Sequence, residues 1–256
     1  MNIHPTAIVD KKANLADGVE VGPYCLIGPD VKIGSGTVIG AHAVIGGHTT
    51  IGKNNRIFTG AVIGSITQDL KFKGDRSFVE IGDNNIIREY VTINMGTNKD
   101  SSTAVGNNVL LMAYCHVAHD CIIKDGAIIA NCGTFAGYVT VEEKADIGGL
   151  TGVHQFVRIG KLAIIGGCSK VTQDVVPFSK SDGHPLKVYG LNTVGLDRAG
   201  IPLESKNFLK KAFKILFHSG LTVSHAEEEI KSKVPKSPEV DYLLEFISAS
   251  ERGIAR

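Results

Sequence analysis

The sequence predicts a mainly β chain, in which a solenoid of short strands and tight turns is followed by a small helical domain. Two observations carry this prediction: apolar residues recur every six positions between residues 3 and 171, and the spacing becomes helical after residue 203. Composition agrees, because glycine makes up 30 of 256 residues and tryptophan is absent. We therefore expect the solenoid over residues 1–190 and the helical domain over residues 191–256.

The period of six begins at Ile3 and fails only at Asp69, Asp75 and Lys99. These failures fall in two polar stretches, 65–80 and 95–104, which we expect to leave the solenoid as loops. An α-helix would scatter such a pattern around its circumference, whereas one short strand and one corner per hexad would point every sixth residue inward. Glycine often follows the inward residue, and we expect it to supply the unusual backbone angles of the corner.

The C-terminal part of the chain shows three helical signals. A spacing of three and four predicts a first helix that ends near Gly220. Ser224 with Glu227 has the spacing of a capping box and predicts the start of a second helix. Ser237 followed by Pro238 predicts the start of a third. The residues that define the first helix are Phe208, Leu209, Ala212, Phe213, Leu216 and Phe217.

Charge and targeting signals limit the partners of the chain. Lys and Arg number 27 against 26 Asp and Glu, so no overall field attracts nucleic acid or an anionic membrane. No apolar run approaches the ~18 residues of a membrane span, and the N-terminus lacks the features of a signal peptide. The five cysteines form no Cys-x-x-Cys pair, which fits reduced thiols. We expect a cytoplasmic protein with no membrane span and no nucleic-acid partner.

The segment 110–121 holds the densest set of reactive side chains. His119 lies two positions after the inward Val117, so it should face outward near a corner. Asp120 beside it could orient the imidazole, and a free histidine, with a pKa near ~6.5, suits a general base. A surface histidine with an incidental acidic neighbour is the competing interpretation.

Two other chemistries are weaker in this segment. His116 and His119 could bind a metal, but three-residue spacing on strand and turn does not converge the rings, and no third ligand is near in the sequence. Cys115 and Cys121 occupy the slim position four after an inward residue, which favours a place in the core over a nucleophilic role. We predict no metal site and no cysteine nucleophile.

The hexad pattern resembles the hexapeptide-repeat acyltransferases, whose fold is a left-handed parallel β-helix with three hexads per coil. Three hexads per coil would stack residues that are 18 apart, about 4.8 Å from each other. Gly137 would then lie directly over His119, and His154 would lie on the same edge roughly 10 Å from His119. A flat solenoid wall needs a loop or another subunit to form a concave site.

Four strings narrow the resemblance to the UDP-N-acetylglucosamine 3-O-acyltransferase branch of this family, and the match covers the coils, both loops and the helical tail. The resemblance implies transfer of a 3-hydroxyacyl chain from acyl carrier protein to the 3-position of UDP-N-acetylglucosamine, the first step of lipid A biosynthesis. It implies no cofactor and no covalent enzyme intermediate. The strings are Ile66-Thr67-Gln68-Asp69-Leu70-Lys71, Ala118-His119-Asp120-Cys121, Gly152-Val153-His154-Gln155-Phe156 and Gly166-Gly167-Cys168-Ser169.

The resemblance also implies roles for individual residues. His119 would be the general base, Asp120 its orienting partner, and the backbone N–H of Gly137 the donor to the oxyanion. Asp69 would contact the acyl 3-hydroxyl, and glycine at Gly167 would leave the acyl groove open for a long chain. The implied substrate-binding residues are Gln68, Asp69, Lys71, His116, His154, Gln155, Gly167, Asn192 and Arg198.

The chain departs from the family pattern at several of its nucleotide and sugar positions. Tyr138 stands where histidine is usual, and Asn94-Met95 where a His-Arg pair is usual. Val194 replaces an acidic contact to uracil, and Ala199 replaces a second arginine. These departures leave nucleotide affinity and the choice between a 3-hydroxyl and a 3-amino sugar open.

Other functions remain open at this point. One is a hexapeptide acyltransferase that uses acyl-coenzyme A on another sugar, and another is a scaffold solenoid without activity. The related N-acyltransferase is disfavoured, because the first hexad begins at Ile3 and leaves no room for its extra N-terminal domain.

The resemblance further implies a homotrimer with active sites between subunits. Acyl carrier protein is acidic, so we expect it to dock on the basic first tail helix, which carries Lys206, Lys210, Lys211 and Lys214.

Overall fold

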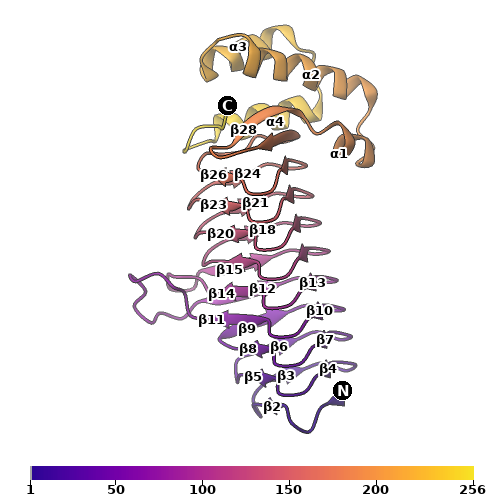
Figure 1. Ribbon diagram of the computed structural model, residues 1–256, viewed down its shortest axis with the longest axis vertical. Coiled ribbons are helices and arrows are strands. Elements are labelled where there is room, and N and C mark those ends of the chain that lie inside the picture. Colours follow the sequence, from indigo (N-terminus) through magenta and orange to yellow (C-terminus); the bar gives the residue numbers. More distant parts are fainter. Residues whose placement is uncertain (1) are drawn as a thin grey trace.

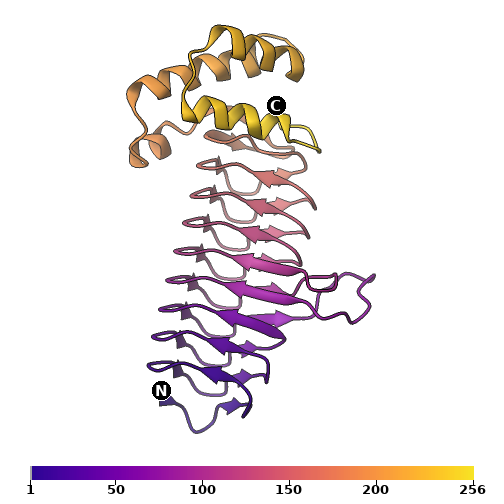
Figure 2. The same ribbon diagram turned by 180° about the vertical axis from the view of Figure 1, so that it is seen from behind.

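The computed structural model describes residues 2–256 as a three-sided parallel β-helix with helices stacked on its C-terminal end (Figures 1 and 2). Strand β1 (Asn2–Ile3) pairs in parallel with β4 (Glu20–Val21), with Asn2 opposite Glu20. Partners in regular coils are thus 18 residues apart, which confirms three hexads per coil. Most strands are two residues long, and each side of the prism is one sheet.

The first sheet consists, in spatial order, of β1, β4, β7 (Val38–Ile39), β10 (Arg56–Ile57), β13 (Ile86–Ile87), β16 (Leu110–Leu111), β19 (Ile128–Ile129), β22 (Asp146–Ile147), β25 (Ile164–Ile165), β27 (Ser179–Asp182) and β28 (Lys187–Leu191). The second consists of β2 (Ile8–Val9), β5 (Leu26–Ile27), β8 (Val44–Ile45), β11 (Val62–Ser65), β14 (Thr92–Asn94), β17 (His116–Val117), β20 (Thr134–Phe135), β23 (Gly152–Val153) and β26 (Lys170–Val171). The third consists of β3 (Asn14–Leu15), β6 (Lys32–Ile33), β9 (His48–Ile51), β12 (Phe78–Ile81), β15 (Ser102–Val105), β18 (Ile122–Ile123), β21 (Thr140–Val141) and β24 (Arg158–Ile159).

The core of the prism is a column of aliphatic side chains from all three sheets. The second residue of a typical strand points inward and is fully buried, as at Ile63, Ile87 and Leu111, and the slim residue four positions later fills the corner, as at Ala43. Side chains of this size pack densely without voids, and the interior has no room for an indole. The glycine-rich, tryptophan-free composition follows from this geometry.

The expectation that glycine supplies the corner angles was wrong. Gly22, which follows an inward residue, has an ordinary φ, and a Cβ there would lie 2.9 Å from the carbonyl oxygen of Ile39 in the next coil. These glycines therefore serve close approach between coils. The left-handed corner residue comes two positions later and is usually not glycine, as at Tyr24 (φ 58°) and Tyr138 (φ 61°). Its N–H donates to the preceding coil, as Tyr138 does to His119 O at 3.0 Å.

Two loops interrupt the coils and protrude together from one side of the prism (Figures 1 and 2). The first, residues 66–77, lies between β11 and β12, and strand partners across it are 30 residues apart, as Val62 and Thr92 are. The second, residues 95–101, lies between β14 and β15, and partners across it are 24 apart, as Thr92 and His116 are. The insertions therefore equal two hexads and one hexad, which is why the period resumes in phase.

The C-terminal segment contains α1 (Thr193–Arg198), α2 (Leu203–His218), α3 (Val223–Lys233) and α4 (Pro238–Ser248). The start of α4 is confirmed, because Ser237 caps it by accepting a hydrogen bond from Val240 N. The predicted start of α3 was wrong: Thr222, not Ser224, is its N-cap, because Thr222 accepts from His225 N. Helix α1 was not predicted, because six residues are too few to show a period.

The helices pack around a second apolar cluster that includes Leu162 and Phe178 of the last coils. Helix α4 is also fixed by polar contacts, since Tyr242 donates a hydrogen bond to Glu142 and Arg158 lies 4.4 Å from the ring centroid of Phe246. No helix within residues 2–256 has the length and apolarity to cross a membrane.

Candidate active site

A groove of about 790 Å³ runs across the second sheet, between the strands β17, β20, β23 and β26 and the tip of the first loop. Most of the predicted site residues line it, although they come from segments far apart in the sequence. The register explains this, because His116, Thr134, Gly152 and Lys170 occupy equivalent places on successive strands. The predicted residues that line the groove are Gln68, Asp69, Lys71, His116, His119, Gly137, His154 and Gln155.

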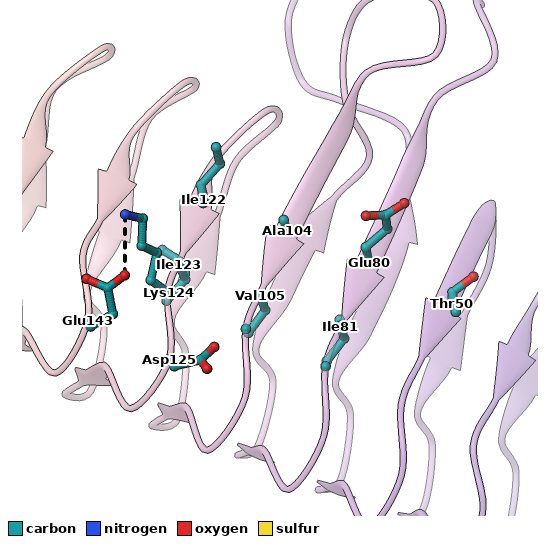
Figure 3. Close-up of a pocket in the computed structure, with 12 residues that line it drawn as sticks. Thr50, Glu80, Ile81, Ala104, Val105, Ile122, Ile123, Lys124, Asp125 and Glu143 are labelled. Carbon is teal, nitrogen blue, oxygen red and sulfur yellow. Dashed lines mark ion pairs between the residues drawn. The ribbon is translucent and has the colours of Figure 1, made fainter.

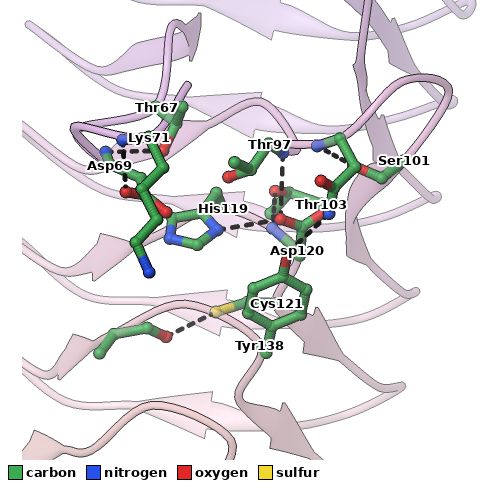
Figure 4. Close-up of polar contacts among 12 residues, drawn as sticks. Thr67, Asp69, Lys71, Thr97, Ser101, Thr103, His119, Asp120, Cys121 and Tyr138 are labelled. Carbon is green, nitrogen blue, oxygen red and sulfur yellow. Dashed lines mark hydrogen bonds and ion pairs between the residues drawn. The ribbon is translucent and has the colours of Figure 1, made fainter. Parts of the chain in front are cut away.

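His119 and Asp120 form a buried pair at the corner after β17 (Figure 4). His119 Nδ1 lies 2.9 Å from Asp120 Oδ2, and the two side chains are only 9% and 6% exposed. The backbone N–H of Thr97 donates to the same carboxylate oxygen at 3.0 Å, and Asp120 N donates to Thr103 Oγ1 at 2.8 Å. With Nδ1 directed at the carboxylate, Nε2 is the nitrogen left for a substrate.

Gly137 lies directly over His119, as the spacing of 18 predicts. A Cβ at this position would overlap the imidazole ring, and φ lies outside the left-handed region, so glycine is needed here for space. The N–H of Gly137 has no acceptor within residues 2–256, and the residue lines the groove. A free amide beside the imidazole can bind a negatively charged oxygen.

His116 contacts a neighbouring strand through one nitrogen of its ring. Its Nδ1 lies 2.7 Å from Thr92 Oγ1. Burial, and secondly the nearby His119, lower the pKa of His116 below its usual value. Within residues 2–256, no group of three His, Cys, Asp or Glu side chains is arranged to hold a metal ion.

The tip of the first loop forms the second wall of the groove. Thr67 Oγ1 accepts from Asp69 N at 3.0 Å, and Asp69 Oδ1 accepts from Lys71 N at 2.9 Å. These local bonds fix a turn that holds Asp69 and Lys71 on the His119 side of the loop (Figure 4). Leu70 at the tip is fully exposed.

Tyr138, one of the departures from the family pattern, connects the second loop to the His119 corner. Its hydroxyl accepts from Asn98 Nδ2 at 2.8 Å, and its ring meets His119 edge-on at 5.3 Å and stacks on Phe156 at 4.9 Å. Burial, and secondly the charge of Asp120, raise the pKa of the Tyr138 hydroxyl. Tyr138 is therefore a neutral hydroxyl that holds the loop in place.

Asn94 and Met95, the other departures near the site, lie beneath the loops and do not line the groove. Asn94 is buried, and its Nδ2 donates to Ile66 O at 3.2 Å, at the base of the first loop. Met95 is buried against Gly47. Both residues support the loop bases.

Gly167, Asn192 and Arg198 do not line the groove within one chain. Gly167 lies between β25 and β26, at the opposite edge of the second sheet from His119. Asn192 caps α1: its Oδ1 accepts from Gly195 N and its Nδ2 donates to Leu162 O, both at 2.9 Å. Arg198 is exposed and lies near Asp146 on the first sheet. Burial raises the pKa of Asp146, and the positive charge of Arg198 offsets part of this rise.

Sequence reasoning missed several residues that shape the site. Thr97 and Thr103 hold Asp120, Thr97 from within the second loop and Thr103 from strand β15 directly after it, and no sequence signal marks either contact. Thr134, Gly152 and Lys170 form the floor of the groove, and their spacing of 18 from His116 could have identified them.

The cysteines near His119 belong to the core, as predicted. Cys115 and Cys121 are fully buried. Burial raises the pKa of Cys115 to about 11 and that of Cys121 to about 12, so both remain thiols at neutral pH.

Comparisons with known proteins first define the class. Residues 102–137 match the bacterial transferase hexapeptide family (six repeats), and residues 174–255 match UDP N-acetylglucosamine O-acyltransferase, domain 2. The chain is similar to LpxA from Acinetobacter baumannii, with a TM-score of 0.96 and 43% identity over 99% of each chain. A UDP-N-acetylglucosamine acyltransferase from Arabidopsis has a TM-score of 0.87 at 37% identity, over 99% of this chain and 100% of the other. The fold and the site thus define a hexapeptide-repeat acyltransferase with a left-handed parallel β-helix.

Relatives in sequence give the particular family. The chain is 49% identical, over 99% of each chain, to the acyl-[acyl-carrier-protein]–UDP-N-acetylglucosamine O-acyltransferase of Thiobacillus denitrificans. It is 50% identical, again over 99% of each, to the enzyme of the same name from Thermodesulfovibrio yellowstonii. The chain belongs to the acyl-[acyl-carrier-protein]–UDP-N-acetylglucosamine O-acyltransferase family, and it is an acyltransferase.

Proposed function

We propose that this enzyme transfers a long 3-hydroxyacyl chain from acyl carrier protein to the 3-position of UDP-N-acetylglucosamine, the first step of lipid A biosynthesis. The names of its relatives supply the substrates. The observation that carries the mechanism is the buried His119–Asp120 pair beside the free N–H of Gly137 in one groove. A base and an oxyanion donor side by side are what attack on a thioester requires.

His119 is the general base in this mechanism. Its Nδ1–H donates to Asp120, which orients the ring, and Nε2 removes the proton of the sugar 3-hydroxyl as the oxygen attacks the thioester carbonyl. The N–H of Gly137 stabilises the oxyanion of the tetrahedral intermediate. Collapse expels the carrier thiolate, which takes up the proton from the imidazolium. The thioester is already activated, so no covalent enzyme intermediate forms.

The acidic and polar groups around this pair have roles in substrate binding. Asp69 accepts a hydrogen bond from the acyl 3-hydroxyl, and Gln68, Lys71, His154 and Gln155 contact the two substrates from the loop wall and from the His119 edge of the second sheet. The absence of a side chain at Gly167 leaves the far edge of the sheet open to a long chain.

The working unit is a homotrimer with active sites between subunits. The outer face of the first sheet carries a short apolar stripe in which Ile86 and Ile128 are each 37% exposed, and burying it would stabilise an assembly. Arg198 lies near that face, away from the groove of its own chain, so an adjacent copy would supply the arginine that pairs with the pyrophosphate. The stripe consists of Ile86, Leu110 and Ile128 on adjacent strands, and Arg56 separates it from Val38.

Acyl carrier protein docks on α2. Lys210, Lys211 and Lys214 are exposed on this helix, whereas Lys206 pairs with Asp197. A row of exposed cations attracts an acidic carrier, mainly by raising the rate of association.

The test is a product assay with matched donors and acceptors. Hydroxymyristoyl carrier protein and hydroxymyristoyl-coenzyme A are each offered with UDP-N-acetylglucosamine and with its 3-amino analogue, and products are identified by mass spectrometry. We expect an ester product from the carrier-bound donor and UDP-N-acetylglucosamine. Preference for coenzyme A, an amide product only, or no product would each refute the proposal in a different respect.

A further inference from the structure

Gly152 combines open surroundings with a backbone conformation that does not require glycine. A Cβ at Gly74, Gly190, Gly200 or Gly220 would meet no atom within 4 Å, but φ at all four positions lies in the left-handed region. Gly152 has the same open surroundings and an ordinary strand conformation. Within residues 2–256 it is the only glycine that combines both properties, so a Cβ at this position would meet nothing in the chain itself.

The position of Gly152 shows what the missing side chain leaves open. It lies on β23 between Thr134 and Lys170, on the outward face of the second sheet, and it lines the groove that contains His119. Outward side chains of a β-strand stand roughly perpendicular to the sheet. A side chain at Gly152 would therefore rise into the groove. The glycine therefore leaves space in the groove for a ligand.

The kind of ligand follows from the hydrogen bonds that Gly152 cannot make. Its N–H donates to Ser169 O at 3.0 Å within the coil, so it is not free to bind a phosphate or a sugar hydroxyl. A polar ligand group loses affinity where the protein surface offers no hydrogen-bond partner, whereas a saturated alkyl chain requires only space. Lys170 beside it can lay its alkyl stem along such a chain and keep its ammonium in water.

We infer that Gly152 is a specificity-determining residue, whose missing side chain makes the path for the alkyl part of the acyl donor. This inference rests on the proposed function, because it assigns part of the same groove to one of the two proposed substrates. A side chain at 152 would then shorten the longest acyl chain that the enzyme accepts and leave the acceptor sugar nucleotide unaffected.

The experiment compares wild type with Gly152→Ala, Gly152→Val and Gly152→Leu on hydroxymyristoyl and hydroxydecanoyl carrier protein. We expect kcat/KM for the longer donor to fall progressively, by about 10- to 100-fold in Gly152→Leu, since one misplaced methylene in a groove costs that much. The shorter donor should lose less than about threefold, and KM for UDP-N-acetylglucosamine should not change. Lys32→Leu, an outward leucine on β6 far from the groove, is the matched control.

The outcomes separate this inference from the proposed function. If the ratio of kcat/KM between the longer and the shorter donor is unchanged in Gly152→Leu, the inference is wrong. The proposed function would still stand in that case, provided that the wild type is active. A raised KM for UDP-N-acetylglucosamine would also overturn it, because the space would then belong to the nucleotide. Wild type that acylates no UDP-N-acetylglucosamine would refute the function itself. Thermal unfolding checks folding, and Gly152→Ala, which adds one methyl group in open space, keeps the test usable if Gly152→Leu fails to fold.

Discussion

Two of the grooves on the β-helix share one scaffold and differ in chemistry. The groove on the second sheet contains the buried His119–Asp120 pair. The other, of about 610 Å³, crosses strands β9, β12, β15 and β18 of the third sheet and ends at Glu143, just after β21 (Figure 3). Its ion pair, Lys124 with Glu143 at 3.4 Å, has side chains 39% and 38% exposed, and such surface pairs contribute little.

The difference between the grooves comes from the loops. Regular hexads produce a shallow channel on any face, because successive strands present outward side chains in rows. On the second sheet, the first loop forms one wall of the groove. The second loop holds the buried carboxylate of Asp120 through the backbone N–H of Thr97. The repeat thus supplies the surface, and its interruptions supply the buried, oriented groups that catalysis needs.

The largest expected difference in kcat is between a variant that removes the base from the second-sheet groove and one that removes a charge from the third-sheet groove. His119→Ala should lower kcat by about 10²–10⁴-fold, the usual contribution of a positioned base. Glu143→Gln, the matched control in the third-sheet groove, should leave kcat within about twofold. Steady-state kinetics with thermal unfolding checks both. Retained turnover in a folded His119→Ala enzyme would remove His119 as the base.

Displacing the His119 ring without removing it should have the next largest effect on kcat. A methyl group in Gly137→Ala would overlap the His119 ring and displace it, and a misplacement of about 1 Å can cost roughly 10²-fold in kcat. Gly46→Ala is the control, because its Cβ would lie 3.9 Å from the nearest atom, Gly64 O. Equal kcat values for the two variants would show that the corner tolerates a side chain over the imidazole.

The periodic parts of the molecule were predictable from the sequence, and so were the contacts that depend only on period. Between β15 and β26 no loop intervenes, so the spacing of 18 correctly stacks Gly137 on His119. The inward aliphatics and the core cysteines followed from the same arithmetic, because each hexad places its residues in the same way.

The contacts made by the loops were not predictable. Thr97 orients Asp120 with its backbone N–H, which any residue except proline could supply, so its side chain gives no signal. The bond from Asn98 to Tyr138 spans 40 residues and depends on how the second loop folds over the corner. The role of the corner glycines was misjudged for a related reason: close approach between coils is a property of the stacked structure.

The bond between Asn98 and Tyr138 tests whether the second loop acts through the dyad. Asn98 follows Thr97, so losing this bond should loosen the N–H that orients Asp120. Asn98→Ala and Tyr138→Phe should each lower kcat about fivefold, the equivalent of one hydrogen bond of ~1 kcal/mol, and leave KM for UDP-N-acetylglucosamine unchanged.

The double variant and a control outside the site make this test specific. Asn98→Ala with Tyr138→Phe should lose no more than either single variant, because both remove the same bond. Tyr138→Phe keeps the ring that stacks on Phe156. Asn107→Ala removes the side-chain bonds that Asn107 makes to Asp125 and accepts from Asp83 N near the third-sheet groove, and we expect it to leave kcat unchanged. Additive losses or a raised KM would instead mean that Tyr138 contacts substrate. In that case the second loop would act on the His119–Asp120 pair through the Thr97 N–H alone, without a contribution from the bond between Asn98 and Tyr138.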